Sequence, residues 1–338
     1  MNTNSDATPA LDTTARAEVL NTLLVLLHQH YVFPKVAQEM ESALRLHMSN
    51  GDYEQVTSSE QFAQLLTTHL QEVSKDKHLH IFYRAEELPE HKEQESEQQQ
   101  KVRWHEYWRA QNYGFQKVER LPGNIGYLDF RAFYPPEYAG ETAIAAMNFL
   151  ANTSALIVDM RYNHGGYPEM IALITSYLFS SEPVHLNDLY WRDNDSTQQF
   201  WTLSYVPGQR YGNKPVYVLT SHETFSGGEE FTYNLKNLKR ATIIGEVTGG
   251  GAHPGGVQRI NAHFEVFIPG GRAISPITNT NWEGTGVTPD IDVPQTEALL
   301  TAQKLALKKI LEDIGDNPEG AQKAVQKEAQ KALQELDH

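Results

Sequence analysis

The chain of 338 residues contains no cysteine and has far fewer basic than acidic side chains. Without cysteine, disulfide bonds, thiolate metal sites and a cysteine nucleophile are all excluded. Lysine and arginine number 28 against 43 aspartate and glutamate residues, and the net charge of −15 argues against nucleic acid or an anionic membrane surface as a partner. A chain of this length can form about two domains with a large hydrophobic core.

Long apolar stretches and a recognisable export signal are also missing. No apolar run reaches the roughly 18 residues that a membrane span requires. Residues 1–15 contain neither the basic stretch nor the apolar segment of a signal peptide. We therefore expect no membrane insertion, and a cytoplasmic protein unless the leader of an exported bacterial protein has been trimmed from it.

Motifs that would indicate a cofactor are absent as well. None of the Gly-rich stretches continues into the Gly-Lys-Ser/Thr of a phosphate-binding P-loop. The 14 histidines include no His-Glu-x-x-His pair, and His78 with His80 suits one face of a strand as well as it suits a pair of metal ligands. We expect no nucleotide, metal or other cofactor.

The pattern of apolar residues divides the chain into four parts. Residues 12–83 carry three stretches with helical spacing, followed by an alternating stretch at 76–83, and predict a small helical domain that ends in a strand. Residues 84–122 are rich in Glu, Gln and Lys and predict a polar connecting segment. Residues 123–314 alternate strand-like and helix-like stretches, which is typical of an α/β domain with a partly parallel sheet. Residues 315–338 predict a helical tail that packs on the body of the protein or on a second subunit.

One short stretch combines a buried strand, a serine and two glycines. Residues 216–219 are apolar and predict a strand, and the apolar spacing from Phe231 onward predicts a helix. Ser226 lies between them, where the first N–H groups of a helix favour negative charge. Either Ser226 caps the helix, with Glu229 completing a capping box, or it is a nucleophile and the N–H of Gly227 forms half of an oxyanion hole. From these residues alone the cap is the commoner solution.

Similar Gly-rich loops follow two other predicted strands. They occupy residues 163–166 and 248–251, in addition to the loop at 226–228. In open α/β sheets, sites form beyond the carboxyl ends of the strands. A single Gly-Gly pair is usually only a turn, but three such loops together predict a site lined by backbone groups.

Four ordered segments resemble the C-terminal-processing (tail-specific) serine peptidase family. They are residues 157–166 (IVDMRYNHGG), 224–229 (TFSGGE), 241–251 (ATIIGEVTGGG) and 282–291 (WEGTGVTPDI). The resemblance implies an α/β fold with a crotonase/ClpP-like ββα spiral core preceded by a small N-terminal helical domain. The segment between the two is too short and too polar for the PDZ domain that members of the family often carry.

The resemblance also implies a catalytic apparatus. The lysine that activates the serine in the bacterial processing enzymes is replaced here by Gly251. The branch that resembles tricorn core protease and interphotoreceptor retinoid-binding protein has a histidine and a glutamate instead. By this resemblance the catalytic residues are Ser226, His78 and Glu283, and the oxyanion hole is formed by Gly227 with Gly165 or Gly166.

The residue types suit these roles. A histidine with the ordinary pKa of about 6.5 can accept the serine proton near neutral pH, and Glu283 would orient the ring and stabilise its charged form. The tricorn-type site has a serine directly before the histidine, where this chain has Lys77. Because neighbouring residues on a strand point to opposite faces, we expect Lys77 to face solvent while Glu283 reaches His78 directly. His253, close to the position of the missing lysine, is a rival base.

The sequence supports two functional hypotheses. The first is a serine-type peptidase that acts on a peptide or protein substrate through an acyl-enzyme on Ser226. The alternative is a catalytically inactive module that binds a retinoid or fatty acid, as the retinoid-binding relative does, with Trp191 or Trp201 near the ligand. Under both hypotheses we expect no nucleic-acid partner, and a homo-oligomer can form through the C-terminal helix.

Overall fold

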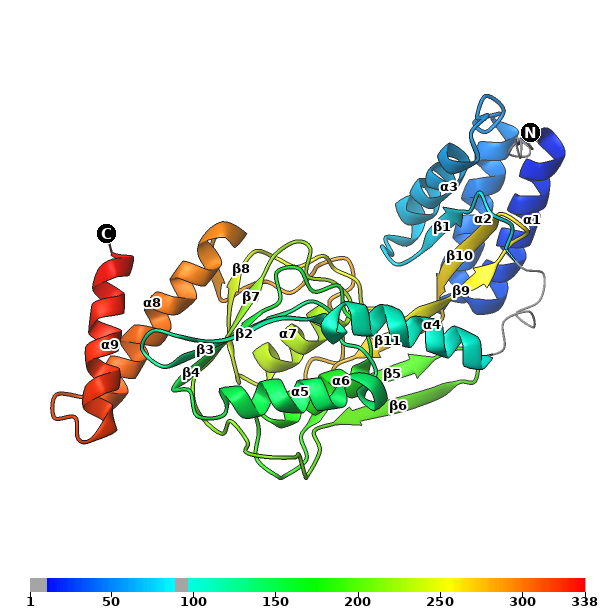
Figure 1. Cartoon of the computed structure of the whole chain (residues 1–338). Helices are drawn as coiled ribbons and strands as arrows, with labels where there is room; N and C mark the ends of the chain where they lie inside the picture. Colours follow the sequence, from blue (N-terminus) through cyan, green and yellow to red (C-terminus); the bar gives the residue numbers. More distant parts are fainter. Residues whose placement is uncertain (1–10, 89–96, 338) are drawn as a thin grey trace, which may run out of the picture. The chain divides into compact units, whose positions relative to one another are not determined.

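The computed structural model describes residues 11–88 and 97–337 and divides the chain into two compact units. Unit 1 comprises Met1–Gln99, Leu189–Thr197 and His253–Ala273, and unit 2 comprises Gln100–Asp188, Gln198–Ala252 and Ile274–His338. Figure 1 shows their helices and strands. The fold is mixed α/β, as predicted.

Unit 1 packs three helices against a small antiparallel sheet. The helices are α1 (Thr13–His30), α2 (Pro34–Ser49) and α3 (Ser59–Ser74), and the sheet has the order β1 (His80–Tyr83), β10 (Phe264–Pro269), β9 (Gly255–Arg259). Side chains at the helix starts satisfy exposed backbone donors: Asp12 accepts from the N–H of Ala15 (2.8 Å) and Ser58 from that of Gln61 (3.3 Å). Leucines of α1 and α3 and apolar residues of β10 form one buried core.

The strands that complete this unit come from far along the chain. Residues 255–275 were expected to belong to the α/β core, whereas in the structure β10 pairs antiparallel with β1, with Ile81 opposite Val266. A strand of four residues needs such a partner, because its backbone groups cannot otherwise be satisfied next to a hydrophobic core. The division into units therefore differs from the boundary predicted at residue 83.

The prediction that a strand begins at Asp76 is wrong. Lys75 ends α3 in the left-handed conformation (φ 58°), and β1 begins only at His80. Between them, Asp76 accepts a hydrogen bond from the N–H of His78 (3.1 Å), which closes a short turn. Asp, Lys and His in this turn produced the alternation that resembles a strand. His78 therefore lies in a turn, and the expectation that Lys77 and His78 point to opposite faces of a strand does not apply.

Unit 2 is built on a six-stranded sheet. Its order is β12 (Ile291–Asp292), β8 (Thr242–Gly245), β7 (Val216–Thr220), β4 (Ala155–Asp159), β3 (Ile125–Phe130), β2 (Phe115–Leu121). Neighbours from β12 to β3 pair in parallel, and only β2 runs antiparallel. The partly parallel sheet of the α/β prediction is confirmed.

Helices cover both faces of this sheet (Figure 1). One face packs against α5 (Pro136–Leu150), α6 (Pro168–Ser176) and α7 (Gly227–Asn237). The other packs against α8 (Gln295–Ile314) and α9 (Ala321–Leu336). Successive residues of β4 alternate between the two cores, since Leu156 and Val158 face the first and Ile157 faces the second. The predicted tail helix α9 buries Ala329 and Ala332 in this second core, so it packs on the body of the protein, the first of the two predicted alternatives.

The predicted polar connector contains regular structure. Described residues of this stretch form α4 (Glu97–Ala110), a 3₁₀ turn η2 (Asn112–Gly114) and the edge strand β2, while residues 89–96 lie outside the described part. β2 pairs with β3 and buries Phe115. The core of unit 2 thus begins before residue 123.

A third sheet has the order β11 (Gly271–Ile274), β5 (His185–Trp191), β6 (Ser196–Trp201), and its residues are divided between the two units. In this sheet β6 begins after the turn at residues 192–195 and ends at Trp201. Within the described ranges, no helix is both long and apolar enough to cross a membrane.

Candidate active site

Ser226 sits at a sharp turn between β7 and α7. Its backbone angles are φ 54° and ψ −121°, a region that side-chain-bearing residues rarely adopt. An ordinary N-cap serine has an extended backbone, and its side-chain oxygen accepts a hydrogen bond from a backbone N–H of the first helical turn. The backbone of Ser226 is not extended. A strained serine on a strand-to-helix turn is the arrangement of a nucleophile whose hydroxyl is pushed out of the fold.

Glu229 holds this turn from the inside. Its carboxylate accepts hydrogen bonds from the N–H groups of Ser226 (3.0 Å), Gly250 (2.6 Å) and Gly251 (2.8 Å), and from the hydroxyl of Thr248. The side chain is fully buried, and burial raises its pKa while these donors oppose the rise. The predicted capping box with Ser226 is present, but Glu229 does more than cap α7, because it ties the serine turn to the loop at residues 248–251.

Two backbone N–H groups converge beside Ser226. A Cβ atom built on Gly165 would lie 2.4 Å from the nitrogen of Gly227, and one built on Gly227 would lie 2.9 Å from the nitrogen of Gly166. Only glycine permits an approach this close. Among the described residues, the N–H groups of Gly166 and Gly227 donate to no acceptor. Both glycines belong to the oxyanion hole predicted from the sequence.

Asn163 shapes this loop and gives Gly165 a different role. Its side-chain oxygen accepts the N–H of Gly165 (2.8 Å), and its amide group donates to the carbonyl of Phe130 (2.9 Å). Its own carbonyl accepts the N–H of Phe225 (2.9 Å). The N–H of Gly165 is thus already used, and Gly165 permits the close approach to Ser226. Of the two predicted alternatives, Gly165 and Gly166, only Gly166 keeps an N–H without an acceptor among the described residues.

Glu283 is anchored on the same Gly-rich loop. The N–H of Ala252 donates to its carboxylate, and the indole N–H of Trp282 donates to the carbonyl of Gly251 (2.7 Å). Gly284 in turn donates to the carbonyl of Gly250 (3.0 Å). Through Glu229 and this loop, the predicted nucleophile and the predicted orienting acid are connected by hydrogen bonds within unit 2.

His78 lies in unit 1, beside a buried aspartate. The carboxylate of Asp76 is fully buried and accepts from the N–H of His78 (3.1 Å) and the hydroxyl of Tyr31 (3.2 Å). Burial lowers the pKa of His78 to about 4, and a charge on His253 also lowers it, while the charge of Asp76 opposes the shift. The imidazole is therefore neutral near pH 7, as a general base must be.

The rival base, His253, is paired with Asp76 as well. Its Nδ1 lies 2.8 Å from the Asp76 carboxylate, and its ring meets that of Phe33 edge-on at 5.2 Å. Although His253 lies in a Gly-rich loop, only 6% of it is exposed. In the sequence, Asp76 begins the alternating stretch at residues 76–83, and His253 follows the Gly-rich loop at residues 248–251. Neither segment indicated that the two side chains would pair.

The structure thus places the predicted site residues in two groups. Ser226, Gly227, Gly165, Gly166 and Glu283 belong to unit 2, and His78 belongs to unit 1. Sequence reasoning missed the bracing roles of Glu229 and Asn163 and the pairing of Asp76 with His253. Glu229 and Asn163 lie inside two of the segments that resemble the family, residues 224–229 and 157–166. Their place in these segments was the signal that could have indicated a role at the site.

Family models match most of the chain. Residues 124–293 match the model of peptidase family S41, and residues 10–110 match that of the N-terminal domain of peptidase S41 in eukaryotic IRBP. The chain belongs to peptidase family S41. The predicted family and fold class are confirmed. Apart from the description of that N-terminal model, nothing in the comparisons favours an inactive binding module.

Relatives of this S41 member include an enzyme and two solved structures. Carboxyl-terminal-processing peptidase 2, chloroplastic, of Arabidopsis thaliana is 28% identical over 196 residues, which are 52% of this chain and 34% of the relative. The chain therefore spans about a third of the length of that curated relative. A candidate peptidase from Parabacteroides merdae has a TM-score of 0.57 at 18% identity, covering 82% of this chain and 90% of that one. A lipoprotein from Streptococcus agalactiae has a TM-score of 0.54 at 14% identity, covering 87% and 96%. These two structures share the fold.

Proposed function

We propose that this S41 member is a serine peptidase that hydrolyses peptide bonds through an acyl-enzyme on Ser226. His78 is the proposed base, and Glu283 the group that orients it. The observation that carries the proposal is the strained backbone of Ser226 beside the converging N–H groups of Gly166 and Gly227. A helix cap requires neither the strain nor the two donors.

Each step of the reaction has a group to perform it. The Ser226 oxygen attacks the peptide carbonyl while its proton passes to the neutral imidazole of His78. The N–H groups of Gly227 and Gly166 stabilise the negative oxygen of the tetrahedral intermediate. The protonated imidazole then gives its proton to the leaving amine, and a water molecule, activated by the same base, hydrolyses the ester.

The environment of Gly251 supports a histidine base over the lysine of the bacterial processing enzymes. The N–H of Gly251 is bound to Glu229 and its carbonyl to Trp282. The backbone at this position thus has a bracing role and carries no side chain that could take a proton. A base supplied by another part of the chain is therefore required.

The test is covalent labelling with a fluorophosphonate probe together with hydrolysis of an unstructured protein such as casein. Wild type should be labelled and active, and Ser226→Ala should lose both properties while its circular dichroism is unchanged. Ser204→Ala, which alters an exposed serine of unit 2, is the matched control and should keep both. Undiminished labelling or turnover in Ser226→Ala would refute the proposed nucleophile.

Peptides or proteins are the substrates that membership of a peptidase family implies.

We further propose that chains associate through α9. This association predicts a mass in multi-angle light scattering that is a multiple of the chain mass of 38.2 kDa. A mass equal to one chain across the micromolar range would exclude it.

A further inference from the structure

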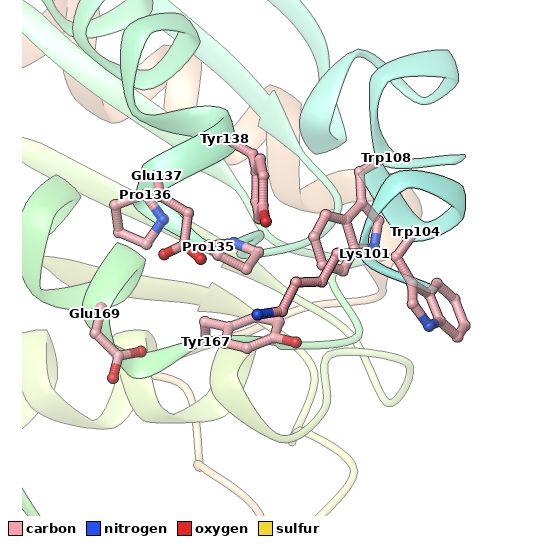
Figure 2. Close-up of a pocket in the computed structure, with 9 residues that line it drawn as sticks. All are labelled: Lys101, Trp104, Trp108, Pro135, Pro136, Glu137, Tyr138, Tyr167 and Glu169. Carbon is pink, nitrogen blue, oxygen red and sulfur yellow. The ribbon is translucent and has the colours of Figure 1, made fainter. Parts of the chain in front are cut away.

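Unit 2 contains a pocket of about 660 Å³ that the proposed catalytic steps do not use (Figure 2). It is formed by α4 and by the starts of α5 and α6. Pockets of roughly 300–1,000 Å³ are typical of ligand sites. This volume is large enough for a long side chain together with part of a peptide backbone.

Aromatic rings form the walls of the pocket. The ring of Trp108 lies 5.6 Å from that of Tyr138 and 6.2 Å from that of Tyr167. Trp104 is 51% exposed and Tyr167 is 45% exposed, although residues of this size are usually covered. Several large aromatic side chains that meet at one exposed pocket indicate a binding site.

Two carboxylates lie on the same pocket. Glu137 and Glu169 occupy the first turns of α5 and α6, where acidic residues also stabilise helix starts. Burial raises the pKa of Tyr167, and the charges of Glu137 and then Glu169 raise it further, so both carboxylates act on this ring. Against these two negative charges stands one positive charge, that of Lys101, whose side chain reaches into the pocket in Figure 2.

We propose that this pocket binds the basic side chain of a lysine or arginine in the peptide substrate. Aromatic faces attract a cation, and the excess of carboxylates adds to this attraction. Lys101 places one ammonium group at this pocket. In the absence of substrate its ammonium occupies part of the space that the ligand needs.

The pocket and the proposed active site are joined through one loop, and the inference rests on the proposed function. Tyr167 directly follows Gly166, and its N–H donates to the carbonyl of Phe133 (2.7 Å), whose own N–H donates to the carbonyl of Gly165 (2.8 Å). These bonds fix Tyr167 next to the loop that contacts Ser226.

Binding is measured first, with the full chain carrying Ser226→Ala so that no hydrolysis occurs. The probes are blocked pentapeptides of alanine with lysine, norleucine or glutamate at the centre, followed by tryptophan fluorescence. The lysine peptide should bind about tenfold more tightly than the norleucine peptide. Glu137→Gln combined with Glu169→Gln should abolish that preference, and Trp104→Ala should weaken binding. Trp201→Ala, which removes an exposed indole of β6 outside the pocket, should leave it unchanged.

Peptide binding by Lys101→Met shows whether the pocket prefers a positive or a negative side chain. Removal of the competing ammonium should tighten binding of the lysine peptide several-fold. Tighter binding of the glutamate peptide to the unaltered pocket, and its loss in Lys101→Met, would overturn the proposal in favour of an anion site. Equal binding of the lysine and norleucine peptides, or saturable binding of retinol in their place, would overturn it in favour of an apolar pocket.

Hydrolysis by wild type then separates the two proposals. Selective binding of the lysine peptide by a protein that hydrolyses neither these peptides nor casein would refute the peptidase and retain the pocket. Hydrolysis of all three peptides at equal rates, without selective binding, would retain the peptidase and refute the pocket.

Discussion

At the level of a single residue, the backbone conformation of Ser226 fits the proposed nucleophile better than an ordinary helix cap. Backbone angles in this region cost a residue with a Cβ atom about 1–3 kcal/mol, a cost that glycine largely escapes. The free energy stored here is balanced by the bonds that Glu229 makes to both sides of the turn. A cap serine in the usual extended conformation would store none.

This strain predicts a difference between two inactive variants. Ser226→Ala and Ser226→Gly both remove the hydroxyl group, but only glycine removes the Cβ atom at φ 54°. Ser226→Gly should therefore be more stable than Ser226→Ala by about 1 kcal/mol or more, despite the greater entropy of glycine in the unfolded chain. Urea unfolding of both variants measures the difference. Equal stabilities would show that the turn is not strained.

The environment of His78 predicts the pH range of activity. Because burial lowers its pKa to about 4, the imidazole stays neutral and able to accept a proton well below pH 6.5. The acid limb of kcat/KM should accordingly have its midpoint closer to pH 4 than to 6.5. A pH series on a fluorogenic peptide is the measurement. An acid midpoint at 6.5 would contradict the role of a buried His78.

At the level of elements, α7 and the loop at residues 248–251 meet at one buried carboxylate. Glu229→Gln keeps the size of the side chain but replaces one acceptor oxygen with an amide group that faces backbone N–H donors. We expect this variant to lose about 1–3 kcal/mol of stability and to turn over substrate about a hundredfold more slowly, because the proposed nucleophile and the proposed oxyanion donors lose their support.

Unfolding and kinetics on the same preparation of Glu229→Gln provide the check. Glu223→Gln is the control, since this glutamate lies in the same turn and its side chain makes no hydrogen bond within the described chain. It should match wild type in both assays. Wild-type turnover in Glu229→Gln would remove the bracing role.

Elements with strong local signals could be predicted from the sequence. The buried strands β4 and β7 are short apolar runs that end in Gly-rich loops, and their order along the chain matched a known family. The pairing of β1 with β10 could not be predicted, because the two strands are far apart in the sequence and the residues of neither strand indicate which strand it pairs with. The turn at Asp76 was mistaken for strand because side-chain capping of a turn can imitate the alternation of a strand.

The candidate site divides in the same way. Ser226, Gly227 and Glu283 stood in contiguous motifs, whereas the burial of His253 depends on Asp76 and Phe33, which are remote from it in sequence. A glycine-flanked histidine is ordinarily exposed, and only the fold reveals that this one is enclosed. The sequence also could not show whether Gly165 or Gly166 supplies an N–H to the proposed oxyanion hole. That choice depends on the hydrogen bond from the N–H of Gly165 to Asn163.

At the level of the whole molecule, two buried groups give opposite dependences of stability on pH. His78 has a folded pKa of about 4 against 6.5 unfolded, so its contribution is complete above pH 6.5 and is lost as pH falls towards 4. Glu230 is 6% exposed, and burial raises its pKa from 4.5 to about 8, helped by the charge of Glu169. Its folded form retains the proton more tightly than the unfolded chain. Its contribution is therefore complete below pH 4.5 and is lost as pH rises towards 8.

These two groups predict a plateau of stability between about pH 4.5 and 6.5, with a fall on either side. Glu230→Gln should flatten the alkaline fall and raise the stability of unit 2 at pH 8 by a few kcal/mol, since each pKa unit is worth about 1.4 kcal/mol. His78→Asn should flatten only the acid fall in unit 1. Tryptophan-detected urea unfolding from pH 4 to 9 measures both limbs, and Glu223→Gln, at a half-buried glutamate of the loop before α7, serves as control. An alkaline limb that survives in Glu230→Gln would show that a different group loses its proton there.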